Sequence, residues 1–110
     1  MSLNELIELF IERHPEYVFP YEARGCCGLA TKEFIDLAKR HGIEAHAALF
    51  RLDRGEWDIH WMVDAGDVFV DFTARQFGLD QPYPLIVTRE FAERNFFRRA
   101  LGLRPEIQKA

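Results

Sequence analysis

The sequence predicts an α+β fold, in which a central core helix packs on a small antiparallel sheet and a further helix lies towards each end of the chain. Two observations predict this class. Apolar residues recur at helical spacing up to Gly42, and from Ala45 onwards they alternate with polar residues at a period of two, which is typical of strands. No repeat or long linker divides the 110 residues, so we expect a single domain over residues 1–110.

The first helix is expected to begin after Ser2, which forms a capping box with Glu5. Helical spacing then relates the apolar residues Leu3, Leu6, Ile7, Phe10 and Ile11. This helix should end before Pro15, because a proline disfavours helical backbone in the residue before it. Residues 15–25 should form a loop.

The second helix is expected to run from Cys26 or Cys27 to His41, with Gly42 as its C-cap. Its buried face should comprise Cys27, Ala30, Phe34, Leu37 and Ala38. Cys27 therefore lies on the inward face of the first turn, whereas Cys26 points about 100° away around the helix.

Three strands are expected after Gly42, over residues 45–52, 57–63 and 68–72, with turns at 53–56 and 64–67. A two-residue loop at Ala65-Gly66, or a four-residue loop over residues 64–67, places Val63 opposite Val68 and therefore His60 directly opposite Asp71. Directly opposed residues share a face of the sheet, with Cβ atoms about 4.5–5.5 Å apart. The hairpin alone thus predicts an imidazole–carboxylate pair.

The rest of the chain should contain an irregular segment and one helix. Residues 73–87 hold Pro82 and Pro84, and Thr88 can cap a helix over residues 89–101, with Phe91, Phe97 and Leu101 in the core and Gly102 and Pro105 ending it. Basic residues gather at this end, namely Arg89, Arg94, Arg98, Arg99 and Arg104. They form either a solvated helix face or an anion-binding patch.

Composition excludes several classes of function. A formal net charge of −4 argues against a general nucleic-acid binder, which needs basic residues to neutralise phosphates. No apolar run approaches the roughly 18 residues of a membrane span, and the first residues lack the pattern of a secretory signal. The only cysteines are adjacent and make no disulfide framework. We therefore expect no membrane partner and a cytoplasmic protein, or one delivered into a target cytoplasm.

A thiol at a helix start, followed by a histidine and a carboxylate on successive strands, is the set that a thiol nucleophile needs. The helix end favours the thiolate, the imidazole takes its proton, and the carboxylate orients the imidazole. Cys27, His60 and Asp71 are the candidates. Each also has a structural interpretation: a small buried residue, a hydrogen-bonding histidine and the start of a turn, respectively.

These residues belong to a wider pattern: Gly25-x-Cys27, Ala30, Thr31 and Phe34, then Gly42-Ile43-x-Ala45, His60-x-x-Val63 and Phe69-Val70-Asp71-x-Thr73-Ala74-Arg75-Gln76-Phe77. The pattern resembles the core of the transglutaminase-like and papain-like cysteine superfamily, most closely its short single-domain bacterial, phage and toxin-associated members. The resemblance covers about residues 25–77. It implies a helix packed on an antiparallel sheet, with Cys27 as nucleophile, His60 as general base and Asp71 as its partner.

The expected activity is acyl transfer by a cysteine peptidase, amidase or deamidase, or by a crosslinking enzyme, on a protein or peptide substrate and without a cofactor. The papain-like glutamine that binds the oxyanion is replaced by Tyr21, so Tyr21 or Gln76 is a candidate donor. Arg75 and Gln76 could lie at the cleft rim and bind substrate, or Arg75 could tie down the following loop. Trp57 and Trp61 are expected as core or cleft walls more than as dedicated ligand binders, and Trp61 is also a substrate-binding candidate.

Three alternatives stay open. Cys26-Cys27-Gly28-Leu29 also resembles the start of bacterial cell-wall endopeptidases, which would make Cys26 the nucleophile. A zinc site could use Cys26, Cys27, His41, His46 and His60, although their spacing matches metal motifs poorly, so we predict no metal. Finally, the chain could be a catalytically weak or idle member of the same fold that acts as a protein-binding inhibitor or adaptor.

Overall fold

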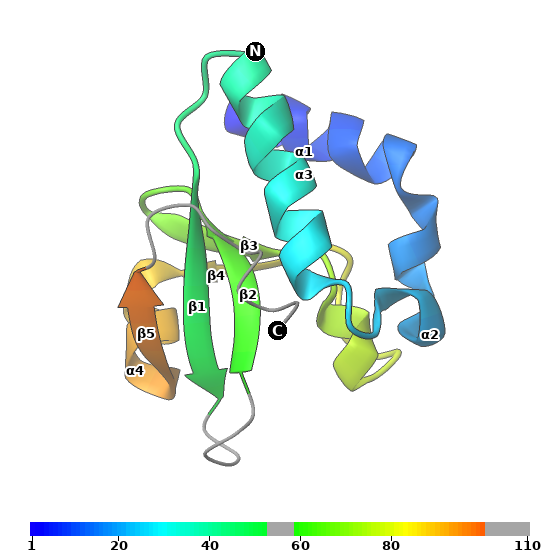
Figure 1. Ribbon diagram of the computed structural model, residues 1–110, viewed down its shortest axis with the longest axis vertical. Helices are drawn as coiled ribbons and strands as arrows, with labels where there is room; N and C mark the ends of the chain where they lie inside the picture. Colours follow the sequence, from blue (N-terminus) through cyan, green and yellow to red (C-terminus); the bar gives the residue numbers. More distant parts are fainter. Residues whose placement is uncertain (53–58, 101–110) are drawn as a thin grey trace.

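The computed structural model describes residues 1–52 and 59–100 (Figure 1). The elements follow in the order α1 (Leu3–Arg13), the 3₁₀ turn η1 (Pro15–Val18), α2 (Pro20–Ala23), α3 (Cys27–Arg40), β1 (His46–Leu52), β2 (Ile59–Asp64), β3 (Val68–Asp71), the 3₁₀ turn η2 (Ala74–Phe77), β4 (Leu85–Thr88), α4 (Arg89–Asn95) and β5 (Phe96–Ala100). The expected α+β class is confirmed.

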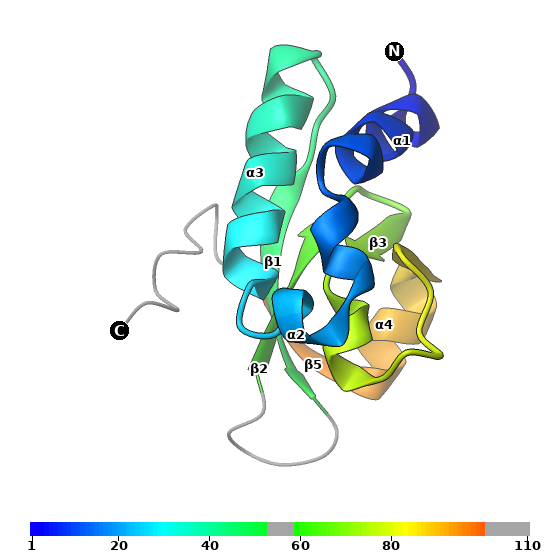
Figure 2. The same ribbon diagram turned by 90° about the vertical axis from the view of Figure 1, so that its right-hand side faces the viewer.

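The strands form one antiparallel sheet in the order β4-β3-β2-β1-β5. The helix α3 lies on one face of it and α4 on the other (Figure 2). On the α3 face, an apolar cluster joins α1 and α3 to Val63, Val70 and Phe72. On the α4 face, Ala92 packs with residues of β1, β2 and β3, including Phe50 and Phe69.

Both long helices form as their sequences predict. The Ser2 hydroxyl accepts from the Glu5 amide and the Glu5 carboxylate accepts from the Ser2 amide, which is the expected capping box. The whole predicted stripe of α3 is buried, namely Cys27, Ala30, Phe34, Leu37 and Ala38. Gly42 follows α3 with φ of 70°, a value that suits glycine and ends the helix.

The loop expected over residues 15–25 is wrong, because η1 and α2 form there. Pro15 and Pro20 each stand at the first position of a short helix, where proline has the right φ and its missing N–H costs nothing. The two prolines therefore begin short helical turns as well as ending the segment before them. These turns carry the chain alongside η2, which α2 contacts.

The register of the β2–β3 hairpin differs from the predicted one by two residues. Val63 pairs with Val70 instead of Val68, because the turn closes through the Ala65 amide, which donates to Val68 O at 3.0 Å, with Gly66 at φ of 95°. His60 is therefore not directly opposite Asp71. A shift of two residues keeps every side chain on its predicted face, so the two residues still share the α4 face.

Two predictions about the end of the chain are wrong. Residues 85–88 form β4, where an irregular segment was expected, because this β-branched run pairs with the outer edge of β3. The last helix ends at Asn95, and β5 then pairs with β1. Alternation in β5 puts Phe96 against Phe50, with ring centroids 5.4 Å apart, an anchor that a continued helix would lose.

Thr88 caps α4 as predicted, since its hydroxyl accepts from the Phe91 amide. Phe91 itself is 52% exposed, so its expected core position is wrong. Trp57, the 53–56 turn, Leu101, Gly102, Arg104 and Pro105 lie outside the described residues, as does the side chain of Phe97.

Candidate active site

Three elements bring the candidate residues to one place. Cys27 begins α3, His60 lies in the first half of β2, and Asp71 ends β3. Beyond the pairs of Val63 with Val70 and Asp64 with Phe69, β3 turns away from β2 (Figure 1). The N-terminal end of α3 lies beside the part of β2 that β3 has left.

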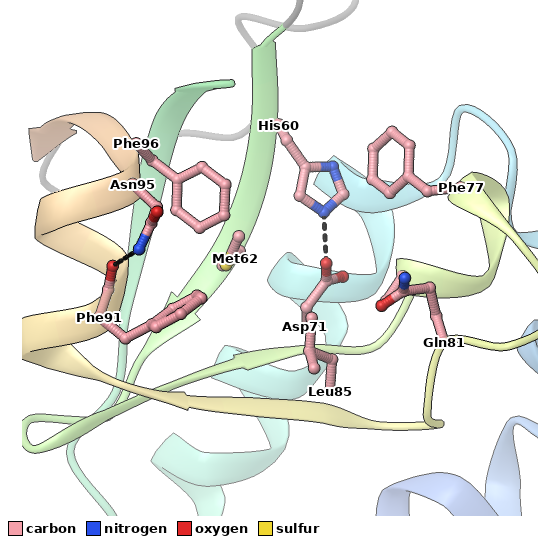
Figure 3. A pocket seen from close by; sticks show the side chains of 10 residues that line it. His60, Met62, Asp71, Phe77, Gln81, Leu85, Phe91, Asn95 and Phe96 are labelled. Carbon is pink, nitrogen blue, oxygen red and sulfur yellow. Dashed lines mark hydrogen bonds and ion pairs between the residues drawn. The ribbon is translucent and has the colours of Figure 1, made fainter. Parts of the chain in front are cut away.

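His60 and Asp71 form a buried pair (Figure 3). The imidazole Nε2 lies 2.7 Å from the carboxylate Oδ2, and the two side chains are 1% and 3% exposed. A carboxylate can only accept, so Nε2 carries a proton and donates it to Asp71. This bond fixes the plane of the ring and leaves Nδ1 available on its other side.

The second carboxylate oxygen of Asp71 is held by Thr73. The Thr73 amide donates to Oδ1 at 2.9 Å, and its hydroxyl lies 3.4 Å from the same oxygen. This contact between residues i and i+2 is the turn that a short acidic side chain makes with its own backbone. Thr73 was part of the recognised pattern without a role, and the Asp-x-Thr spacing is the signal that could have identified it.

Gln76 closes this network into a ring of contacts around the imidazole. Its Nε2 lies 3.2 Å from Thr73 Oγ1 and 3.4 Å from His60 Nδ1. Because the Thr73 hydroxyl donates to Asp71, its oxygen accepts from the Gln76 amide, which orients Nε2 towards the ring. Gln76, predicted as an oxyanion or substrate-binding residue, therefore lies beside Nδ1.

His60 also interacts with Cys27. Burial disfavours the charged imidazole, but the charge of Asp71 and its hydrogen bond, together with a hydrogen bond and charge interaction with Cys27, outweigh burial. They raise the pKa of His60 from its usual 6.5 to about 10. His60 thus interacts both with the Cys27 thiol and with the Asp71 carboxylate.

Cys26 lies outside this arrangement, partly buried and just before the first residue of α3. Its pKa is raised, first by burial and then by the negative charges of Cys27, Glu22 and other nearby carboxylates. A raised pKa keeps the thiol protonated and less reactive at neutral pH. The contacts of the two cysteines thus favour Cys27 over Cys26 as the nucleophile.

The other predicted site residues have different surroundings. Tyr21 is 80% exposed and so does not belong to the buried network. The guanidinium of Arg75 donates to the backbone carbonyls of Gln81 at 2.5 Å and Val18 at 3.1 Å, which matches the loop-tying alternative. Trp61 is 1% exposed and packs with Cys27, Ala47 and Leu49 as a wall under the thiol; its indole Nε1 has no hydrogen-bond partner among the described residues.

Phe77 is an aromatic neighbour of the imidazole, a role that the sequence analysis did not predict. The ring of Phe77 lies edge-on to His60, with centroids 5.1 Å apart and an interplanar angle of 73° (Figure 3). Phe77 is the last residue of η2 and is 38% exposed. It shields one side of the imidazole from water, and its adjacency to Gln76 in the sequence was the available signal.

The alternative sites can also be compared with the structure. Among residues 1–52 and 59–100, no group of three or more His, Cys, Asp and Glu side chains could hold a metal ion.

The arginines of the possible anion-binding patch have acidic partners. Arg89 and Arg98 both bind the Asp64 carboxylate, and Arg94 pairs with Glu90, so these arginines are neutralised by acidic partners. None of the helices in the described part of the chain is long and apolar enough to cross a membrane.

Comparison with known proteins adds no identification. No protein family model, no curated protein and no solved structure matches this chain. The resemblance to the transglutaminase-like and papain-like superfamily therefore stays a prediction from the quoted motifs.

Proposed function

We propose that the protein is a papain-like or transglutaminase-like cysteine hydrolase or acyltransferase that acts on a protein or peptide substrate. One observation carries this proposal: a buried imidazole hydrogen bonds through Nε2 to Asp71 and also to the thiol at the start of α3. An imidazole bonded on one side to a carboxylate and on the other to a thiol is the arrangement that makes a nucleophilic thiolate.

In the proposed mechanism the Cys27 thiolate attacks the carbonyl carbon of an amide, forming a carbon–sulfur bond and an oxyanion. Collapse of this intermediate breaks the carbon–nitrogen bond, and His60 as imidazolium protonates the departing amine. Water or a second amine then attacks the thioester and releases the thiol, with His60 accepting the proton of the attacking group. Hydrolysis and crosslinking differ only in this last step.

The oxyanion needs hydrogen-bond donors at the sulfur. The amide of Cys27 lies at the N-terminal end of α3, where the helix dipole favours a developing negative charge. Gln76 supplies the second donor. Its Nε2 lies 3.4 Å from Nδ1 of His60, and when Nδ1 is protonated the two N–H groups repel each other. The Gln76 N–H then turns towards the substrate. We assign Gln76 the role of oxyanion donor on this ground.

The burial of the site favours one other function. Cys27 is 8% exposed and His60 is 1% exposed, so a substrate carbonyl reaches the sulfur only after the segments around them move apart. A fold in which they never separate would be a catalytically idle binding protein, such as an inhibitor or adaptor. The thiol's reactivity distinguishes the two functions.

The test is alkylation by iodoacetamide between pH 5 and 8, followed by mass spectrometry of each cysteine. We expect fast modification of Cys27 that persists at low pH, because the imidazolium stabilises the thiolate. The modification should survive in Cys26→Ala and be largely lost in His60→Gln, a variant of similar size. If both cysteines react slowly and only at high pH, the enzymatic proposal is wrong and the binding function stands.

A further inference from the structure

A cavity of about 330 Å³ lies on the α4 face of the sheet, with His60 and Asp71 in its wall (Figure 3). Cys27 packs on the opposite face, among residues that contact α3. The imidazole therefore stands between the thiol and this cavity. A group bound in the cavity would lie one side chain away from the sulfur.

The lining of the cavity selects an uncharged ligand. Apart from His60 and Asp71, which neutralise each other, it consists of apolar side chains from η2, β2, β4, α4 and β5, and of two amides, Gln81 and Asn95. A charged ligand group would lose its hydration here without gaining a partner of opposite charge. The amides can donate to and accept from a neutral polar group such as a peptide bond.

Two aromatic residues at the cavity are partly exposed. Phe91 on α4 is 52% exposed and Phe77 on η2 is 38% exposed. They contribute to opposite sides of the cavity in Figure 3, with Met62 between them. Apolar side chains around a concave site with a few polar groups are typical of ligand pockets, and the volume is that of a small one.

We propose that this cavity binds an uncharged apolar side chain of the peptide substrate, next to the bond that Cys27 attacks. The amides of Gln81 and Asn95 then bind the peptide backbone on either side of that residue. The inference rests on the proposed function for its substrate, but binding at the cavity can be measured without any reaction. It predicts a preference for aromatic and large aliphatic residues over charged residues and glycine.

The experiment uses the full chain carrying Cys27→Ala and methyl-labelled methionine. The chain has two methionines: Met62 lines the cavity, whereas Met1 is 60% exposed and serves as an internal control. N-acetyl-phenylalanine amide should give a saturable NMR shift of the Met62 methyl and none of Met1. N-acetyl-glycine amide and N-acetyl-aspartate amide should bind at least about tenfold more weakly.

Two adjacent positions on β4 provide a matched pair of variants. Leu85 lines the cavity, whereas Ile86 is 47% exposed and points to the other face. Leu85→Trp should abolish the Met62 shift by filling the cavity, and Ile86→Trp should leave it unchanged. Phe91→Ala, at an exposed position that α4 tolerates, should weaken binding without loss of fold.

Three results would overturn the proposed cavity function. They are binding of N-acetyl-phenylalanine amide to Leu85→Trp, equally tight binding of N-acetyl-aspartate amide, and no saturable shift in the Cys27→Ala protein. None of these outcomes depends on the Cys27 thiol, which this variant lacks. Cavity binding together with unreactive cysteines would leave the cavity function intact and overturn only the proposed catalysis. A reactive Cys27 without binding at the cavity would leave the proposed catalysis intact and overturn the cavity function.

Discussion

The imidazole Nε2 of His60 lies 2.7 Å from the Oδ2 of Asp71 in the buried interior, although the two residues come from strands that have already diverged. The contact is diagonal across the hairpin, since Asp71 stands two positions from its predicted register. Thr73 holds the second carboxylate oxygen, so Asp71 cannot rotate away without losing that contact. The pair is therefore rigid, which is what a base that must receive a proton from one direction requires.

Asp71→Asn tests whether the carboxylate sets the tautomer of His60. The side-chain oxygen of the new amide would accept from the Thr73 amide, so its NH₂ would face Nε2 and turn that nitrogen into an acceptor. A neutral imidazole then carries its proton on Nδ1 and cannot take one from Cys27. We expect iodoacetamide alkylation of Cys27 at pH 7 to slow at least about tenfold. Asp67→Asn, at an exposed turn position, is the control; an undiminished rate in Asp71→Asn would contradict this role.

Gln76→Ala tests the assigned oxyanion donor by comparing two reactions of one thiol. Acylation by p-nitrophenyl acetate passes through a tetrahedral oxyanion, whereas alkylation by iodoacetamide displaces iodide without one. We expect the burst of p-nitrophenolate to slow by about 10²–10³, as for the loss of one oxyanion donor, while the alkylation rate changes only a few-fold. Equal slowing of both reactions would show that Gln76 only positions His60.

Much of this site follows from local rules that a sequence shows directly. The capping box at Ser2 and the buried stripe of α3 depend on residues within a few positions of one another, and both are confirmed. The shared face of His60 and Asp71 depends only on the even length of one turn. It was therefore predicted correctly although the predicted register was wrong by two residues.

The rest of the fold depends on contacts that are distant in the sequence. The strand β4 forms because β3 has an open edge, although Pro82 and Pro84 suggested an irregular segment. The strand β5 forms because Phe96 and Arg98 reach partners on β1, β2 and β3, which overrides a local helical pattern. Leu85 of β4 and Phe96 of β5 complete the wall of the cavity beside His60, so the local sequence pattern did not predict the cavity.

Asp64→Asn tests what holds α4 and β5 on the sheet. The Asp64 side chain is 8% exposed, binds both Arg89 and Arg98, and accepts from the Gly66 amide at 3.0 Å. Removing its charge leaves two guanidinium groups over the ring of Phe69 without their main partner. Because both arginines are partly exposed, we expect a loss of about 2–3 kcal/mol in the free energy of unfolding by urea.

The control for this variant is Asp36→Asn. Asp36 pairs with Lys32 at 2.8 Å on the exposed side of α3, with both side chains about half exposed. Such pairs contribute about 0.3–0.5 kcal/mol. Equal destabilisation by the two substitutions would show that the Asp64 cluster contributes no more than an ordinary surface pair.

The raised pKa of His60 makes stability depend on pH, and the Cys27→Ala background isolates the imidazole–carboxylate pair. In the unfolded chain the imidazole loses its proton above about pH 6.5, whereas in the folded protein Asp71 keeps it protonated to a higher pH. The stabilisation is therefore fully present below pH 6.5 and is lost as the pH rises towards the folded pKa. The free energy of unfolding should fall by up to about 1.4 kcal/mol per pH unit across this interval. His60→Gln in the same background should lack this slope, and the difference between the two urea titrations from pH 6 to 9 measures it. A difference that stays constant, or grows with pH, would mean that the folded protein does not hold the proton that the proposed mechanism needs.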